Sequence, residues 1–294
     1  MSRRHRFLGT RINPKRYHPS QMPFFLFLIP FSVLMLLPIL FIVNQAFKPQ
    51  SELFAYPPRF FVRRPTLDNF SQLSSLISSS GVPFSRYLLN SVFVTVVGVL
   101  LAILFTGLSA YALSKLKFRS KKVLFELNTL ALMFVPIAVQ IPRFLIIAKL
   151  GLIDSYAAHI FPVICMPVAM FLIKQFIDQT PNELIESAKI DGASEMQIFF
   201  KIIVPIVAPA IATVGILAFQ AIWNDTTTST LYINDESKRT LAFYMSSLVS
   251  AQGNTVAGQG MAAAAGLIMF LPNLILFIFL QSKVMNTMAH SGLK

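Results

Sequence analysis

Six long stretches of mostly apolar residues run through this chain, and they constrain its fold more than any other feature. A hydrocarbon core about 30 Å thick is crossed by roughly 20 apolar residues in a helix. Within lipid, backbone groups must find their hydrogen bonds inside the protein, which a helix provides. The stretches are Phe24 to Phe47, Tyr87 to Ser114, Val123 to Leu150, Ser155 to Ile177, Ile206 to Trp223 and Met261 to Gln281. The sequence therefore predicts an all-α integral membrane protein with six transmembrane helices.

The composition and the placement of charge support this class. Only 13% of the 294 residues are charged and 55% are hydrophobic, whereas soluble domains carry about 25% charge. The net charge of +13 is compatible with nucleic-acid binding, so the positions of the basic residues must decide. They cluster in two short segments, namely Arg3, Arg4, Arg6, Arg11, Lys15 and Arg16 before the first stretch, and Lys115, Lys117, Arg119, Lys121 and Lys122 between the second and third. Short basic loops face the cytoplasm, so we expect no nucleic acid partner.

This placement predicts the topology and the domain limits. Both termini and the segment after the fourth stretch are expected on the cytoplasmic side of a prokaryotic plasma membrane. Residues 1–23 form a basic cytoplasmic N-terminus, residues 24–284 the six-span domain, and residues 285–294 a cytoplasmic C-terminal tail. We expect the first stretch to remain in the protein, because no small-residue cleavage site follows an apolar segment of the usual signal-peptide length.

The residues that carry chemistry are sparse. No Gly-Lys pair exists, so the chain lacks a phosphate-binding loop. The four histidines are far apart and Cys165 has no partner cysteine, which argues against catalysis, a metal site and a disulfide. Arg143 and Glu126 lie near the ends of apolar stretches, and an ion-coupled transporter commonly places charges deeper. We therefore expect a transport protein that is not itself an enzyme and takes its energy from another polypeptide.

A polar segment from Thr180 to Pro209 separates the fourth and fifth apolar stretches. Thr180, Pro181 and Glu183 predict an N-cap and a helix from Pro181 to Ile190. Ser194 with Gln197 predicts a second cap and a helix from Glu195 to Pro205, where proline cannot donate the next helical hydrogen bond. The two helices are expected to join at Asp191-Gly192. A capped polar pair of this kind, placed in the cytoplasm, predicts a docking surface for a soluble partner.

The same segment resembles a known family loop. Glu186-Ser187-Ala188, Asp191-Gly192-Ala193, Phe199, Ile202, Pro205 and Pro209 resemble the "EAA" loop of permease subunits in binding-protein-dependent ABC importers. Weaker matches favour the MalG-type carbohydrate branch, namely Asn90-Ser91, Ala110-Tyr111-Ala112-Leu113-Ser114, Leu150-Gly151-Leu152 and Trp223-Asn224-Asp225. Ser187, Ser120 and Thr226 depart from the usual pattern without changing the spacing of the loop.

The resemblance implies a type I ABC importer permease fold with a coupling loop at about residues 180–205. It implies half of a pathway for a carbohydrate, most simply an oligosaccharide. The implied partners are a second permease, two ATPase subunits that hold ATP and Mg²⁺, an extracytoplasmic solute-binding protein and membrane lipid, while this chain binds no cofactor. The coupling residues would be Glu186, Ser187, Ala188, Asp191, Gly192 and Ala193. Glu186 would pair with a basic group of the ATPase or, alternatively, with Lys189 in its own helix.

Other candidate residues have less specific signals. Phe199, Ile202 and Pro205 are expected to pack the loop against the spans, and Ile198, Phe199, Ile202 and Ile203 form an apolar stripe at helical spacing. Trp223, Asn224, Asp225, Asn273 and Arg143 are candidates for a pathway or gate. Trp223 also suits an interfacial aromatic belt, and Arg143 suits snorkelling to the membrane surface. An importer of a polyamine or phosphonate, an ion-coupled transporter and a membrane scaffold remain alternatives.

Overall fold

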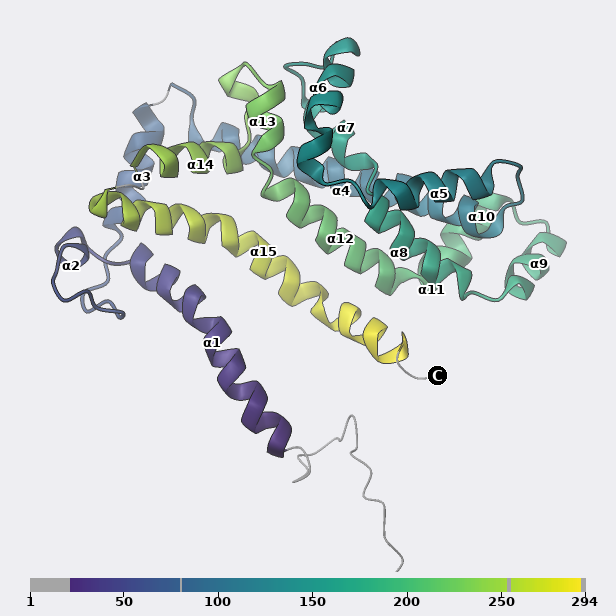
Figure 1. Ribbon diagram of the computed structural model, residues 1–294, viewed down its shortest axis with the longest axis horizontal. Helices are drawn as coiled ribbons and strands as arrows, with labels where there is room; N and C mark the ends of the chain where they lie inside the picture. The colour runs from purple at the N-terminus through teal and green to yellow at the C-terminus, as the bar shows by residue number, and fades with distance from the viewer. Residues whose placement is uncertain (1–21, 80, 253–254, 292–294) are drawn as a thin grey trace, which may run out of the picture.

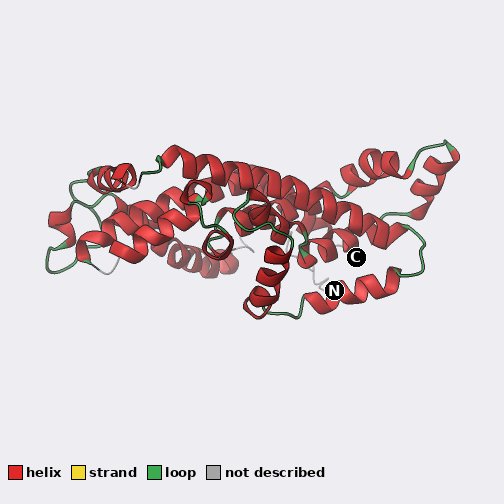
Figure 2. Cartoon of the chain, turned by 90° about the horizontal axis from the view of Figure 1, so that it is seen from above, coloured by secondary structure: helices red, strands yellow, loops and turns green. Residues whose placement is uncertain are grey.

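The computed structural model describes residues 22–79, 81–252 and 255–291, and every regular element within those ranges is helical (Figures 1 and 2). The elements are α1 (Met22–Ala46), α2 (Gln50–Leu53), α3 (Asp68–Ser79), α4 (Phe84–Lys115), α5 (Lys121–Ala131), η2 (Pro136–Val139), α6 (Gln140–Lys149), α7 (Tyr156–Ile164), α8 (Pro167–Asp178), α9 (Asn182–Ile190), α10 (Glu195–Ile198), η3 (Phe199–Ile203), α11 (Val204–Ile206), α12 (Ala208–Trp223), α13 (Thr227–Tyr232), η4 (Glu236–Lys238), α14 (Leu241–Gln252) and α15 (Val256–Ser291). The predicted all-α class is confirmed.

Within the described ranges, three helices are long and apolar enough to cross a membrane as single elements: α1, α4 and residues 258–281 of α15. Helix α4 lies at the centre, because it packs against α7, α8 and α12. Its inward positions carry small residues such as Gly98, Ala102 and Gly107, which let neighbouring helices approach closely. Helix α1 contacts α15 and is otherwise largely exposed along its length.

The other three predicted spans are bent pairs, which together with the single helices give up to six crossings. The pairs are α5 with η2 and α6, bent by 112°, α7 with α8, bent by 43°, and the α10 to α11 region with α12, bent by 84°. The third predicted span, Val123 to Leu150, thus corresponds to a sharply bent pair rather than to one continuous helix. Pro136 stands at the start of η2, where it cannot continue the hydrogen-bond ladder of α5.

The last helix also differs from its predicted limits. Helix α15 begins at Val256 and continues to Ser291, so it runs into the segment expected as a C-terminal tail. Residues 1–21 of the predicted basic N-terminus and the final residues 292–294 lie outside the described residues.

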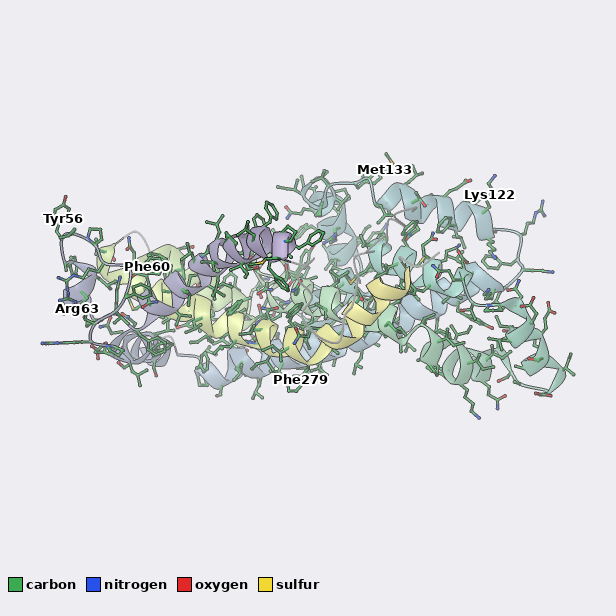
Figure 3. All side chains as sticks on the ribbon, turned by 90° about the horizontal axis from the view of Figure 1, so that it is seen from below. Tyr56, Phe60, Arg63, Lys122, Met133 and Phe279 are labelled. Atoms are coloured by element: carbon green, nitrogen blue, oxygen red, sulfur yellow. The ribbon has the colours of Figure 1, made fainter. Side chains whose placement is uncertain are left out.

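The molecule is elongated, and its two ends differ in character. Helices α2 and α3 lie at one end, with Tyr56 and Arg63 on the loop between them, whereas α9 and α10 lie at the opposite end (Figures 1 and 3). Lys122 of the predicted cytoplasmic loop lies toward the α9 end (Figure 3). The basic loop between α4 and α5 and the polar segment after α8 thus lie at the same end of the bundle.

Candidate functional site

The segment from Thr180 to Ile206, called here the coupling segment, leaves the bundle after α8 and returns to it at α12. Its first helix, α9, ends in a tight reversal at Gly192, whose φ is +80°. The N–H of Gly192 donates to the Lys189 carbonyl and the N–H of Ala193 donates to the Ala188 carbonyl, each at 3.0 Å. This pair of bonds is a Schellman C-cap, which places glycine at the residue with positive φ. The predicted reversal at Asp191-Gly192 is confirmed.

The beginning of α9 differs from its prediction. Pro181 occupies the N-cap position and no side chain caps the helix, so the predicted Thr180 cap is wrong. Thr180 is buried, and its hydroxyl has no hydrogen-bond partner. The Lys115 amine from the end of α4 instead donates to the Thr180 carbonyl at 2.6 Å and to the Asn182 side chain at 2.8 Å. This long-range contact anchors the start of α9 to α4, but it is no substitute for a cap, because an amine cannot accept from the free N–H groups of the first turn.

The second helix begins as predicted and ends differently. Ser194 and Gln197 form the expected capping box, with bonds of 3.3 and 2.8 Å. The helix does not stop at Pro205. It widens into the π-helical turn η3 and continues through α11 before the 84° bend into α12. The wider turn changes the ladder ahead of Pro205, so the missing N–H of proline does not end the helix there.

One face of the coupling segment packs on α4 and α8. Ile185 from α9 and Ile198, Phe199 and Ile203 from the second helix are buried in one cluster with Ala110, Tyr111, Ala169, Ile173 and Ile177. Ile202 packs at its edge, which places the predicted apolar stripe at a helix interface. Pro205 was assigned to the same packing, but it is exposed. It lies two residues beyond Ile203 and so points away from the buried face.

The opposite face is exposed and carries polar residues beside the apolar side chains of Leu184, Ile190 and Met196. Glu186, Ser187 and Asp191 are exposed, while Ala188 is nearly buried. The alternative pairing of Glu186 with Lys189 is not observed, since Lys189 contacts Glu195 at 2.6 Å. No ion pair involves Glu186 among the residues that the structure describes. A carboxylate without an internal cation thus remains available at the α9 end.

Glu186 also borders a depression of about 700 Å³ between α9 and the loop after α4. Lys115, Lys117 and Lys121 line the other side of this depression, while Lys189 and Glu195 line the same side as Glu186. Three of these four lysines are already engaged: Lys115 holds the start of α9, Lys121 donates to the Ser114 carbonyl at 2.8 Å, and Lys189 pairs with Glu195. The depression therefore has a fixed polar wall on α4 and a polar wall on the coupling segment.

Local sequence patterns did not indicate the polar contacts that join α4 to the coupling segment and to α8. The Tyr111 hydroxyl donates to Glu195 at 2.6 Å, and Ser114 donates to Asp178 at 2.5 Å. Lys174 pairs with the same Asp178 at 2.6 Å. The family match at residues 110–114 includes Tyr111, but it does not indicate that Tyr111 contacts Glu195.

Three of the proposed pathway residues meet at the far end of α12. Trp223 is buried, stacks on Phe219 with ring centroids 5.7 Å apart, and donates its N–H to the Met269 carbonyl at 3.1 Å. Asn273 donates to the same carbonyl at 3.0 Å and to the Asn224 side chain at 3.4 Å. These contacts join α12 to α15. The ring face of Trp223 is engaged in packing, so the two amides are the polar groups that remain at this junction.

Asp225 and Arg143 lie elsewhere. Asp225 accepts from the backbone N–H groups of Thr227 and Thr228, each at 3.1 Å, and so orders the start of α13. The pKa of Tyr232 in α13 is raised above its ordinary value, mainly because the side chain is buried. The charge of Arg143 opposes this rise, whereas the charge of Asp225 adds to it. The five candidates therefore form two groups rather than one.

The segment between α13 and α14 is tied to the start of α4. The Asn90 amide donates to the Ser237 and Arg239 carbonyls at 2.8 and 2.9 Å, and the Ser91 hydroxyl accepts from the Leu241 N–H at 2.7 Å. These bonds account for the Asn90-Ser91 match found in the sequence. The segment between α13 and α14 is thereby held against the start of α4.

Asp154 and Lys238 fasten the same segment to the loop after α6. The Asp235 N–H donates to Asp154 at 2.9 Å and the Lys238 amine at 3.0 Å. These two interactions, the backbone bond first, lower the pKa of Asp154. A depressed carboxyl pKa contributes stability above the unfolded-state pKa, and that contribution is lost as the pH falls through the folded-state pKa. The fastening is consequently intact at neutral pH.

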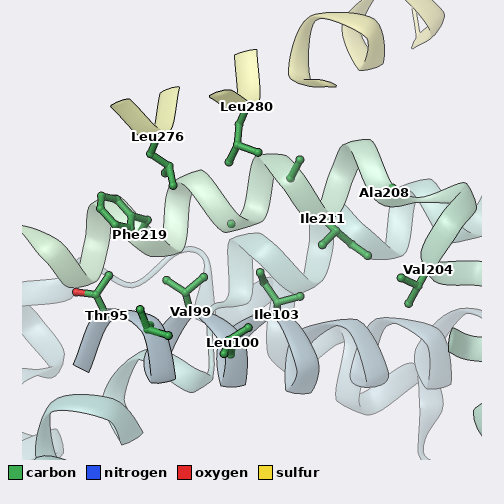
Figure 4. A pocket seen from close by; sticks show the side chains of 13 residues that line it. Thr95, Val99, Leu100, Ile103, Val204, Ala208, Ile211, Phe219, Leu276 and Leu280 are labelled. Atoms are coloured by element: carbon green, nitrogen blue, oxygen red, sulfur yellow. The ribbon is translucent and has the colours of Figure 1, made fainter. Parts of the chain in front are cut away.

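An apolar groove of about 550 Å³ lies between α4, α12 and α15 (Figure 4). Val99 and Ile103 of α4 face Ile211 and Phe219 of α12 across it, and Thr95 supplies a hydroxyl (Figure 4). Leu276 and Leu280 of α15 close a third side (Figure 4). Within the described ranges, no three His, Cys, Asp or Glu side chains gather as metal ligands.

Comparison with known proteins identifies relatives over nearly the whole chain. A family model described as "Binding-protein-dependent transport system inner membrane component" matches residues 7–282. The chain is 34% identical to protein LplC of Bacillus subtilis over 280 residues, covering 92% of each protein. It is 30% identical over 270 residues to the arabinooligosaccharides transport system permease protein AraQ of the same organism, covering 92% of this chain and 94% of AraQ.

A solved structure has the same fold. It is the crystal structure of a bacterial ABC transporter involved in the import of the acidic polysaccharide alginate. The match has a TM-score of 0.75 at 22% identity, covering 92% of this chain and 99% of that chain.

Proposed function

Because this chain belongs to the family of binding-protein-dependent transport system inner membrane components, we propose that it is one of two permease subunits of an ATP-driven oligosaccharide importer. It is a multi-pass protein of the cytoplasmic membrane. The assembly contains a second permease, two ATPase subunits that hold ATP and Mg²⁺, and an extracytoplasmic solute-binding protein. An oligosaccharide cargo is supported by relatives such as the arabinooligosaccharide permease AraQ.

One observation carries the proposal: a capped two-helix segment with an exposed face of polar and apolar side chains at one end of an apolar bundle. The Schellman reversal at Gly192 and the capping box at Ser194 fix the shape of this segment, and its apolar side is anchored on α4 and α8. A segment of this kind can transmit a push from a docked protein to the spans. The ATPase subunits dock on its exposed face, where Glu186 pairs with a basic group.

The proposed orientation follows from charge. The coupling segment and the basic loop containing Lys117 and Lys122 lie at the same end of the molecule (Figures 1 and 3), and short basic loops are retained in the cytoplasm. The α9 end therefore faces the ATPases and the α3 end faces the binding protein. Both termini are cytoplasmic in this arrangement.

The substrate path runs between this chain and the second permease. The open groove between α4, α12 and α15 contributes an apolar wall, in which Thr95 provides a hydroxyl. The amides of Asn224 and Asn273 can each donate and accept hydrogen bonds, so they suit the hydroxyl groups of a sugar near the outer end of this wall. Trp223 supports these amides by holding α12 against α15.

Uptake by the complete complex in proteoliposomes tests the function. We expect oligosaccharide uptake to require the loaded binding protein outside and ATP at the ATPase face, and to continue when ionophores collapse the ion gradients. Uptake that stops with the ion gradient and ignores removal of the ATPases would establish an ion-coupled transporter instead. ATP-dependent uptake of a polyamine or phosphonate, with no oligosaccharide transported, would overturn the cargo assignment alone.

A further inference from the structure

Two routes lead from the coupling segment into the membrane-spanning helices. The first follows the chain through η3 and α11 into α12, and it contains a π-helical turn and an 84° bend. Such turns interrupt the regular hydrogen-bond ladder of a helix and are frequent at hinges. The second route leaves the covalent chain and passes directly from the segment to α4.

The apolar part of this second route is a close fit between Phe199 and α4. Phe199 is 4% exposed, and its ring lies 5.7 Å from the ring of Tyr111. A Cβ added at Gly107, one helical turn before Tyr111, would lie 3.2 Å from the tip of the Phe199 ring. Residues four apart lie on the same face of a helix, so Gly107 and Tyr111 together form a notch that holds Phe199.

The polar part is a chain of three side chains beside the notch. The Tyr111 hydroxyl donates to one oxygen of Glu195 at 2.6 Å, and the Lys189 amine contacts the other oxygen at 2.6 Å. Tyr111 is only 3% exposed, whereas Glu195 and Lys189 are about half exposed. Hydrogen bonds to an ionised carboxylate are shorter and stronger than neutral ones. Glu195 thus joins α9, α10 and α4 at a single carboxylate.

From this geometry we propose that Tyr111, Glu195 and Lys189 form a connector that transfers movement of the coupling segment to α4. The inference rests on the proposed function, because it presumes that a partner moves the segment. Lys189 fixes Glu195 relative to α9, and Tyr111 carries the displacement to the helix that packs on α7, α8 and α12. These are positioning residues, since none of them touches substrate or nucleotide.

Two substitutions distinguish a connector from simple packing between the coupling segment and α4. In Tyr111→Phe the ring that contacts Phe199 is kept and only the hydroxyl bond is lost. In Glu195→Gln the ion pair with Lys189 is lost while an oxygen that can accept from Tyr111 remains. If the three residues act as one unit, their effects on coupling must be non-additive.

The test measures the oligosaccharide transported per ATP hydrolysed by the complete complex in proteoliposomes. We expect this ratio to fall about tenfold in Tyr111→Phe, as for loss of a hydrogen bond to a charged group. Glu195→Gln should also lower the ratio, and the double variant should be no worse than the poorer single variant. Tyr156→Phe is the matched control, because the Tyr156 hydroxyl also bonds to α4 at its opposite end, donating to Asn90 at 2.8 Å and accepting from Arg86 at 3.5 Å. Its ratio should equal that of the wild type.

The outcomes separate this inference from the proposed function. If the wild-type complex shows no ATP-dependent uptake, the proposed function fails and the connector fails with it. If the wild type transports and Tyr111→Phe retains its full ratio, the connector alone is refuted. Independent effects that add in the double variant, or an equal fall in Tyr156→Phe, would reduce Tyr111 to a structural role. Recovery of intact complexes by size-exclusion chromatography checks assembly in every variant.

Discussion

Gly192→Pro combined with Glu186→Ala should abolish oligosaccharide uptake while the complex still inserts into the membrane and its ATPase subunits still hydrolyse ATP. Gly192 has a φ of +80°, whereas proline fixes φ near −65°. Proline also lacks the N–H that Gly192 donates to the Lys189 carbonyl. The strain and the lost bond together disfavour the reversal by roughly 3 kcal/mol, about a hundredfold in population. Glu186→Ala additionally removes the exposed carboxylate proposed for docking.

Gly151→Pro is a matched control for the backbone change. Gly151 has a φ of +68° and ends α6 with the same bonding pattern, through the Ala148 and Ile147 carbonyls. It lies outside the coupling segment, so its replacement should reduce stability without changing the uptake per ATP. Wild-type uptake by the Gly192→Pro, Glu186→Ala variant would refute the lever role of the segment.

Phe199→Ala should have the second largest effect, because it empties the notch on α4. Truncation of a buried phenylalanine destabilises a protein by about 3–5 kcal/mol. We expect a lower melting temperature of the purified complex in detergent, together with a lower uptake per ATP. Both losses have the same cause, since Phe199 belongs to the core that joins the coupling segment to α4 and α8.

Phe200→Ala provides the neighbouring comparison. Phe200 is 49% exposed and touches Phe199 edge to face, with ring centroids 4.9 Å apart. Its removal should cost on the order of 1 kcal/mol and leave the uptake per ATP near the wild-type value. Equal losses of stability and of uptake per ATP in the two alanine variants would mean that packing of Phe199 in the notch is not specifically required for coupling.

The features that could be predicted from sequence were those set by local chemistry. Apolar length located the spans, glycine identified the reversal at residue 192, and Ser194 with Gln197 identified a cap that the structure contains. Long-range contacts overrode local signals elsewhere. Pro181 rather than Thr180 takes the N-cap position of α9, whose start is anchored to α4 by Lys115, and the helix continues through the π turn past Pro205.

The candidate site was predictable to a smaller extent. The exposed face of α9 follows from its polar residues, but the partner of Tyr111 lies 84 positions along the chain, where no local pattern points to it. The side chains of Asn224 and Asn273 contact each other. Asp225 instead accepts from the backbone at the start of α13, and Arg143 affects Tyr232 of that helix electrostatically. Proximity in sequence grouped Asp225 with Trp223, but the turn after α12 directs their side chains to different neighbours.

Cross-linking from Ile190 tests most directly the claim that the coupling segment receives the ATPase. Ile190 ends α9 and is 86% exposed, and Tyr56 is 95% exposed at the opposite end of the molecule (Figure 3). A photoreactive amino acid is placed at either position in the assembled complex. We expect an adduct with the ATPase subunit from position 190 and none from position 56. Assembled complexes that give no ATPase adduct from position 190, or give it from position 56 instead, would contradict it.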